Sequence, residues 1–278
     1  MKIDFVKMHG LGNDFVMLDA TRNKFNLSKE QIIALAQRHT GIGFDQLLIV
    51  EPATSAAVDF AYRIFNSDGN EVEQCGNGAR CFAQYVRKIG LTDKHEIKVQ
   101  TLAAIMHLKV LNEIDVEVDM GRAVFSPEDV PFLTEESSAP YRLKLTSADV
   151  EFEVVNIGNP HAVLFVDDVD AVDIQAIGAE LEMHPAFPKR CNVQFVQVLG
   201  RDQIKQRIFE RGAGETMASG SGACAAAAAA IQTERVNNQL RVSMPGGELS
   251  LSFDPDTQHI LMTGPTAFSF SGSVELLS

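Results

Sequence analysis

Two stretches of this sequence, 144 residues apart, resemble each other without a gap. Arg63-Ile64-Phe65 recurs as Arg207-Ile208-Phe209, and Glu71 recurs as Glu215. Chance is a poor explanation for several identities at one interval. We therefore predict two copies of one fold, and with only two copies a solenoid is excluded.

The same interval relates two glycine-rich loops. Residues 75–79 read CGNGA and residues 219–223 read SGSGA, each just before an apolar run that predicts a helix. A looser match at an interval of 146 residues aligns Gly12-Asn13 with Gly158-Asn159, each leading into a predicted strand. Each copy should therefore contain a strand, a glycine-rich loop and a helix start in the same order.

The repeat predicts two domains of similar size, residues 1–120 and 121–264. A pair of such domains should face each other across a cleft where equivalent loops meet. The last predicted strand has no counterpart in the first copy, so we expect residues 265–278 to return to the first domain. Residues 126–140, rich in Pro, Ser and acidic side chains, are expected to form a surface connection.

Short alternating runs predict many strands and few helices. KIDFVKM, DFAYRIF and NVQFVQVL are typical half-buried strands, and most such runs are joined by short turn signals. One of four predicted helices follows Ser28, which has the capping-box spacing to Gln31. The predicted class is α+β, with a mainly antiparallel sheet around a central helix in each domain.

Composition narrows the possible partners. The chain has 278 residues, 45% of them hydrophobic, and a net charge of −13. This charge argues against nucleic acid or an anionic membrane as a partner and favours a small polar substrate. No stretch is long enough for a membrane span and the N-terminus lacks a signal-peptide core, so a cytoplasmic protein is expected.

The four cysteines differ in what their positions predict. They lack the spacing of a zinc site, so no metal is expected. Cys81, Cys191 and Cys224 are expected to be small buried hydrophobic side chains. Cys75 should begin a helix, where free N–H groups and the helix dipole favour its thiolate. Its pKa should therefore fall below the usual value.

Two such helix starts facing one ligand would offer backbone N–H groups to a carboxylate. Acid and base groups on opposite sides of the adjoining carbon could then remove its proton and return one to the other face. The intermediate carbanion needs fixed donors in a dry site. No pyridoxal phosphate or other cofactor would be required.

Several motifs resemble one known family. NSDGNEVEQCGNGARC at 66–81 and ERGAGETMASGSGACA at 210–225 are similar to the two active-site motifs of diaminopimelate epimerase, and HGLGNDF, GNPHAV and KRCNVQFV match as well. The resemblance spans nearly the whole chain. It implies a pyridoxal-independent isomerase that interconverts LL- and meso-diaminopimelate, for lysine and cell-wall synthesis, with two cysteines as bases in a cleft between similar domains.

The resemblance also implies roles for particular residues. Cys75 and position 219 would be the bases, with His161 and Glu210 near them. Arg211 would pair with the distal carboxylate of the substrate. The residues expected to contact the substrate are Asn13, Gln46, Asn66, Gly76, Asn77, Asn159, Asn192, Glu210, Arg211, Gly220 and Ser221.

Position 219 departs from the family pattern, which has cysteine there. A serine hydroxyl has a far higher pKa than a thiol and is a weak base, so low activity is expected. The motif around Ser219 is otherwise intact. We interpret the serine as a Cys→Ser substitution that disables the site or prevents a disulfide with Cys75.

Two other functions remain open. One is a proline-racemase-like enzyme, either a racemase or a hydroxyproline dehydratase, whose substrate lacks the distal amino-acid group. The other is a diaminopimelate-binding protein without catalysis. Members of the resembled family often form homodimers, and the apolar strand AFSFSG could contribute an edge to such a dimer; the alternative is a covered sheet edge in a monomer.

Overall fold

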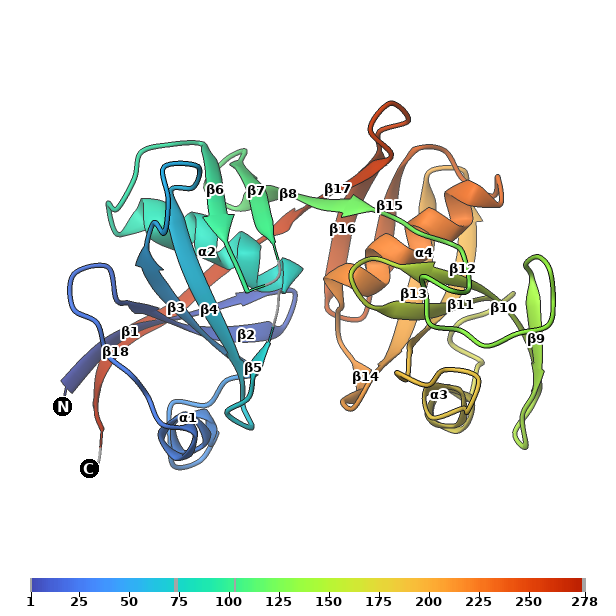
Figure 1. The fold of residues 1–278 in the computed structure, drawn as a ribbon, viewed down its shortest axis with the longest axis horizontal. Helices are drawn as coiled ribbons and strands as arrows, with labels where there is room; N and C mark the ends of the chain where they lie inside the picture. The colour runs from blue at the N-terminus through green and yellow to red at the C-terminus, as the bar shows by residue number, and fades with distance from the viewer. Residues whose placement is uncertain (1, 73–74, 103, 277–278) are drawn as a thin grey trace. The chain divides into compact units, whose positions relative to one another are not determined.

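The computed structural model describes residues 2–72, 75–102 and 104–276. The chain divides into two compact units (Figure 1). The first comprises residues 1–119 and 263–278, and the second residues 120–262. The chain passes from the first unit to the second within one strand and returns within another.

The described residues of the first unit form two helices and a set of mostly antiparallel strands. The helices are α1 (Lys29–Ala36) and α2 (Gly76–Lys88). The strands are β1 (Lys2–Gly10), β2 (Asn13–Asp19), β3 (Gln46–Pro52), β4 (Phe60–Asn66), β5 (Glu71–Val72), β6 (Glu96–Gln100), β7 (Ile105–Val110), β8 (Asp115–Arg122) and β18 (Ala267–Glu275). β18 pairs antiparallel with β1, so the two ends of the chain share one sheet.

The second unit has the same kinds of element. Its helices are α3 (Ile174–Glu182) and α4 (Gly220–Gln232). Its strands are β9 (Tyr141–Lys144), β10 (Asp149–Asn156), β11 (Pro160–Phe165), β12 (Asn192–Gly200), β13 (Gln203–Glu210), β14 (Gly214–Thr216), β15 (Gln239–Met244), β16 (Gly247–Phe253) and β17 (His259–Pro265). β8 and β17 are the strands in which the chain changes unit.

The strand register repeats between the units. β2 and β3 are parallel and pair Phe15 with Gln46, while β11 and β12 are parallel and pair His161 with Asn192. Both residues of the second pair lie 146 positions after their counterparts. The helices α2 and α4 instead begin 144 positions apart. The interval therefore changes between the third and fourth strands of the repeat.

A hairpin accounts for the change of interval. In the first unit the β3–β4 pairing continues to Pro52 opposite Phe60, and the corresponding pair in β12–β13 is Val198 opposite Ile204. The segment between the paired residues is thus two residues longer in the first unit. The extra residues leave the strands on either side in register.

Each unit has helices on both faces of its central strands. Side chains alternate along a strand, so Val16, Leu18 and Leu47 pack with Leu35 of α1, whereas Phe15 and Leu48 lie under the first turn of α2. α1 begins as predicted, because Ser28 and Gln31 form a capping box.

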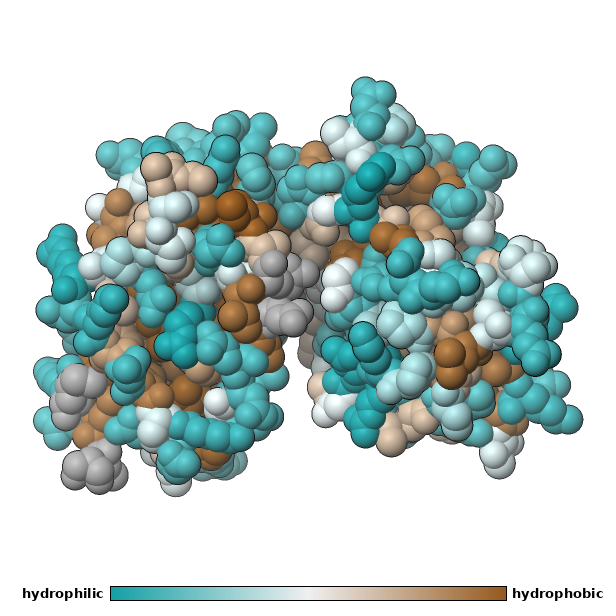
Figure 2. Space-filling view, viewed as in Figure 1, coloured by the Kyte–Doolittle hydropathy of each residue, from teal (hydrophilic) through white to brown (hydrophobic). Residues whose placement is uncertain are grey.

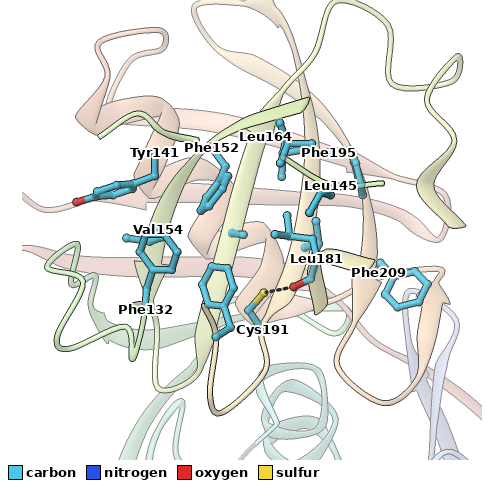
Figure 3. Close-up of a cluster of buried hydrophobic side chains, with 14 of the residues drawn as sticks. Phe132, Tyr141, Leu145, Phe152, Val154, Leu164, Leu181, Cys191, Phe195 and Phe209 are labelled. Atoms are coloured by element: carbon cyan, nitrogen blue, oxygen red, sulfur yellow. Dashed lines mark hydrogen bonds between the residues drawn. The ribbon is translucent and has the colours of Figure 1, made fainter. Parts of the chain in front are cut away.

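The second unit repeats this packing, and its core contains several aromatic side chains. Phe132, Phe152 and Phe187 pack together in the same cluster as Leu181 of α3. The Cys191 thiol donates to the Leu181 carbonyl oxygen (Figure 3). On the other face lies α4, whose alanines are buried. The predicted α+β class with two similar repeats is confirmed.

The expected surface connection at 126–140 is wrong at two positions. Most of this segment is exposed, but Val130 and Phe132 are buried in the core of the second unit. Two apolar side chains anchor a segment whose Pro, Ser and acidic composition indicated a loop. Elsewhere, hydrophilic residues cover much of the face of each unit that Figure 2 shows.

Candidate active site

The two long helices begin in the same way. Cys75 is the N-cap of α2, in an extended conformation, and its sulfur accepts from the Gly78 N–H at 3.4 Å. Ser219 is the N-cap of α4 in nearly the same conformation, and its Oγ accepts from the Gly222 N–H at 3.3 Å. Serine is a favourable N-cap, so the helix start itself tolerates the loss of the sulfur.

The glycines inside these first turns differ in the space around them. A Cβ atom at Gly222 would lie 2.5 Å from Cδ1 of Ile208, whereas one at Gly78 would lie 3.2 Å from Cδ2 of Leu48. The sheet thus approaches the start of α4 more closely than the start of α2. Of Gly78 and Gly222, the second leaves no room for a methyl group unless Ile208 moves.

A chain of amides meets the Cys75 thiol in the first unit. The thiol donates to Oδ1 of Asn13 at 3.9 Å, and Nδ2 of Asn77 donates to the same oxygen at 3.3 Å. Nδ2 of Asn13 donates to Oδ2 of Asp45 at 3.0 Å. At the other end, Nη2 of the fully buried Arg80 donates to Oδ1 of Asn77 at 2.9 Å.

Asp45 belongs to an ion-pair cluster beside this chain. Arg38 contacts Oδ1 of Asp45 at 2.7 Å and both oxygens of Asp14 at 2.8 and 2.9 Å, and Lys7 also pairs with Asp14. Burial alone would raise the pKa of the Asp14 carboxyl, but Arg38 and Lys7 hold it well below its usual value. The Asp14 carboxyl is therefore ionised near neutral pH.

Gln46 and Asn66 lie together at the ends of two paired strands. Gln46 begins β3, Asn66 ends β4, and Nε2 of Gln46 donates to Oδ1 of Asn66 at 2.9 Å. Their counterparts in the second unit are Asn192, which begins β12, and Glu210, which ends β13. The expected substrate-binding residues thus occupy strand ends and helix starts in both units.

A different chain of side chains leads to Asn159 in the second unit. Oδ1 of Asn159 lies 2.7 Å from Nε2 of His161, and Nδ1 of His161 lies 2.8 Å from Nε2 of Gln194. Nδ2 of Asn159 donates to Oγ of Ser221 at 3.5 Å. An amide oxygen only accepts and an amide nitrogen only donates, so the imidazole is neutral and carries its proton on Nε2.

Burial explains why His161 stays neutral. Its side chain is inaccessible to solvent, and this desolvation, together with the positive charge of Arg211, lowers its pKa to about 3. The ring therefore donates to Asn159 over the whole physiological pH range.

The remaining predicted residues of the second unit form a third group. The Arg211 N–H donates to Oδ1 of Asn192 at 2.9 Å, and Nη1 of Arg211 donates to the Lys189 carbonyl at 3.0 Å. Thr216 donates to Oε1 of Glu210 at 2.5 Å. Arg211 is exposed, which leaves its guanidinium accessible to a ligand.

Sequence reasoning did not identify Asp45, Arg80 and Gln194. Asp45 directly precedes Gln46, and Gln194 is a polar residue within a buried strand pattern. Arg80 and Gln194 could have been flagged as polar residues between apolar neighbours. Their partners, however, follow only from the fold.

The thiols fall into two classes. Cys75 is partly exposed, whereas Cys81, Cys191 and Cys224 are buried, as predicted. Within the described residues, none of the four forms a disulfide bond. Burial raises the pKa of the Cys81 thiol to about 12. Among the described residues, no three His, Cys, Asp or Glu side chains lie close enough to bind a metal ion, and no helix is long and apolar enough to cross a membrane.

Comparison with known proteins assigns the family. The family model for diaminopimelate epimerase matches residues 5–126 and 153–269. Over 276 residues, the chain is 48% identical to the diaminopimelate epimerase of Ectopseudomonas mendocina and 49% identical to that of Aromatoleum aromaticum, covering 99% of this chain and 100% of each relative. The chain belongs to the diaminopimelate epimerase family.

Solved structures of other proteins share the fold of this epimerase family member. A PhzF-family phenazine biosynthesis protein from Bacillus anthracis superposes with a TM-score of 0.69 at 17% identity, covering 99% of each chain. A hydroxyproline epimerase from Agrobacterium vitis superposes with a TM-score of 0.70 at 12% identity, covering 98% of this chain and 92% of that one. At these identities the likeness concerns the fold alone.

Proposed function

We propose that this protein is a pyridoxal-independent epimerase that interconverts LL- and meso-diaminopimelate, with its activity reduced by Ser219. The observation that carries the proposal is the pair of equivalent helix starts, capped by Cys75 and Ser219, in a chain so similar to curated diaminopimelate epimerases. The enzyme is an isomerase of lysine biosynthesis.

The proposed reaction uses the two N-cap positions on one α-carbon. A thiolate at one position takes the α-proton, and the electron pair of the broken C–H bond moves toward the substrate carboxylate. Backbone N–H groups at Gly76, Asn77, Gly220 and Ser221 stabilise that charge, since the first N–H groups of a helix have no partner within the helix. The other position then donates its proton to the opposite face.

The side chains at the strand ends are proposed to bind the distal part of the substrate. Asn13, Gln46, Asn66, Asn159, Asn192 and Glu210 offer amide and carboxylate groups to its ammonium and carboxylate. Arg211 is exposed and can pair with a carboxylate through two parallel hydrogen bonds. Arg211→Lys should weaken diaminopimelate binding although charge is kept, and equal affinity in calorimetry would reject the role.

The proposal is tested with Ser219→Cys, which restores the family residue. LL-diaminopimelate, L-proline and trans-4-hydroxy-L-proline are each incubated with this variant and with Cys75→Ser/Ser219→Cys as control. We expect the Ser219→Cys variant to invert diaminopimelate and neither of the other two compounds. We expect the control to invert none of the three. Turnover of proline or hydroxyproline instead would favour the racemase alternative, and tight diaminopimelate binding without inversion would favour a binding protein.

We also propose a cytoplasmic homodimer. Cysteines that form no disulfide bond, as in the described part of this chain, are usual in a reducing compartment. β18 is mostly exposed and carries Phe270, which is 53% exposed, as an apolar anchor for a second copy. Light scattering after size exclusion is expected to give twice the chain mass of 30.4 kDa. A Phe270→Ser variant should then shift toward the monomer.

A further inference from the structure

The two asparagines that repeat at the interval of 146 residues are turned in opposite directions. In the first unit, Asn13 directs its carbonyl oxygen at the Cys75 thiol and at Asn77. In the second unit, Asn159 directs its N–H at Ser221 and its oxygen at His161. The start of α2 therefore faces a hydrogen-bond acceptor, and the start of α4 faces a hydrogen-bond donor.

The orientation of Asn13 follows from the two ends of its hydrogen-bonded chain. At one end the Asp45 carboxylate only accepts, and at the other end the Arg80 guanidinium only donates. Asn77 must therefore give its N–H to Asn13, and Asn13 must give its own N–H to Asp45. The carbonyl oxygen of Asn13 is the group left for the thiol.

The second unit lacks both of these charged ends at the equivalent positions. Asp45 corresponds to the buried Cys191, and Arg80 corresponds to the buried Cys224. Conversely, His161 and Gln194 correspond to Phe15 and Leu48, which cannot hydrogen-bond through their side chains. The repeats thus use different residues to hold the same asparagine.

We infer that Asp45 is a positioning residue, which keeps the Asn13 carbonyl oxygen directed at Cys75 and so favours the protonated thiol there. The inference rests on the proposed role of Cys75 as acid and base. An acceptor stabilises S–H, whereas an amide N–H in the same place would stabilise the thiolate. Asp45 therefore sets which proton state the first helix start favours, through Asn13 rather than by contact with a substrate.

Other titratable groups near the Cys75 thiol do not mask the effect of Asp45 on its protonation state. Tyr62 of β4 and Cys81 of α2 interact electrostatically with Cys75, but burial raises the pKa of both, so they stay neutral. Among the described residues of this hydrogen-bonded chain, the charged groups are Arg80 of α2, at the far end, and Asp45 with Arg38 and Asp14 at the near end.

The test measures the pKa of Cys75 from the pH dependence of its alkylation by iodoacetamide, read by mass spectrometry. The chain with Ser219 suits this, because Cys75 is its one partly exposed thiol and all four are described. No turnover is needed, so failure of the inference is separate from failure of the epimerase assignment. Asp45 itself is 43% exposed at its side chain, which favours a folded variant.

Asp45→Asn is expected to lower the pKa of Cys75 by about one unit, or about tenfold in alkylation rate below the pKa. The Asp45 carboxylate accepts from Arg38 at Oδ1 and from both Asn13 and the Asp14 N–H at Oδ2. An amide accepts through only one of its two end atoms, so Asp45→Asn holds Asn13 less firmly and allows it to rotate. Glu71→Gln, which removes a carboxylate without contacting Asn13, should leave the pKa unchanged.

A double-mutant cycle separates positioning from simple loss of charge. Asn13→Ala alone should lower the pKa of Cys75 by roughly half a unit, since a hydrogen bond contributes about 0.5–1.5 kcal/mol. In that background Asp45→Asn should add little. If Asp45→Asn shifts the pKa equally with and without Asn13, the effect is coulombic and the inference is overturned. Should Asp45→Asn not fold, an unchanged pKa in Asn13→Ala would overturn it as well.

Discussion

The first turns of α2 and α4 have the same backbone conformation but differ in the side chains that lie beside them. Both helices run for 13 residues from an extended N-cap, and in both the N-cap side chain accepts from the N–H three residues on. The hydrogen-bonded chain that reaches the first turn of α2 ends at an acidic residue, Asp45, and a basic residue, Arg80. Behind the first turn of α4 lies a neutral imidazole, His161, held by Gln194.

The two repeats have the same main-chain geometry at these helix starts. They differ in the side chains that orient Asn13 and Asn159. Backbone N–H groups are fixed by the helix itself, so both starts can stabilise an anion regardless of what lies behind them. The proton state of the N-cap group depends instead on neighbouring acceptors and donors. Two copies of one fold can therefore become unequal acid and base partners.

The largest expected effect comes from making the two N-caps alike. Inversion needs a competent acid and base on opposite faces, so Ser219→Cys should raise epimerase turnover by roughly 100- to 10,000-fold in both directions. In heavy water, the chain with Ser219 should still admit deuterium into one stereoisomer faster than it inverts that isomer. Near-equal turnover by both chains would show that position 219 is not a catalytic base.

The second prediction replaces His161 by phenylalanine, the residue at the equivalent position 15. Gln194 is fully buried and loses its acceptor, so His161→Phe should cost roughly 1–3 kcal/mol of unfolding free energy at pH 7. Urea titration measures this loss.

The pH dependence sharpens the same comparison. The folded pKa of His161, about 3, lies below its unfolded value, so unfolded chains bind more protons between those values. The stabilisation is full above about pH 6.5 and falls by about 1.4 kcal/mol per unit as the pH drops toward 3. His161→Phe should lack this component, whereas the control His107→Phe at an exposed site should keep it. Parallel pH profiles for all three proteins would contradict the buried neutral imidazole.

The third prediction concerns the space under each helix start. Gly222→Ala should destabilise the fold by roughly 1 kcal/mol, the low end for overpacking, because the obstructing atom is the tip of Ile208. Gly78→Ala requires the tip of Leu48 to move by only a few tenths of an ångström, so this variant should stay within about 0.5 kcal/mol of the parent. Both variants gain the same helix propensity, so their difference in thermal midpoint reports the packing alone.

The smallest effect on stability is expected for an ion pair that both units contain. Arg63 pairs with Glu71 at 2.8 Å and Arg207 pairs with Glu215 at 2.7 Å, and all four side chains are partly exposed. Glu71→Gln and Glu215→Gln should each cost no more than about 1 kcal/mol, and by similar amounts. A much larger loss for one of them in urea unfolding would show that the pairs are not equivalent.

Much of the fold was accessible from the sequence because local signals agreed. The interval of 144 residues located both helix starts, alternation located the strands, and Ser28 with Gln31 marked the start of α1. The capping role of Cys75 also followed from its place before Gly-Asn-Gly.

What the sequence did not reveal depends on contacts between distant residues. Asp45 orients Asn13 only because parallel pairing of β2 and β3 brings together residues 32 positions apart. Gln194 reaches His161 across the same pairing in the second unit. Val130 and Phe132 are buried although their neighbours are Pro, Ser and acidic residues, because tertiary packing outweighed local composition.

The difference in length between the β3–β4 and β12–β13 hairpins indicates a position where the fold accepts additional residues. Strand β3 carries Gln46 at one end and Pro52 at the other, about 20 Å away at the usual rise of a strand. The two-residue difference in length lies beyond Pro52, and the pairing of Gln46 with Asn66 is undisturbed by it. The exposed tip around Ser55 and Ala56 is therefore a suitable insertion point for a peptide tag or a fluorescent reporter that leaves the reaction unaffected.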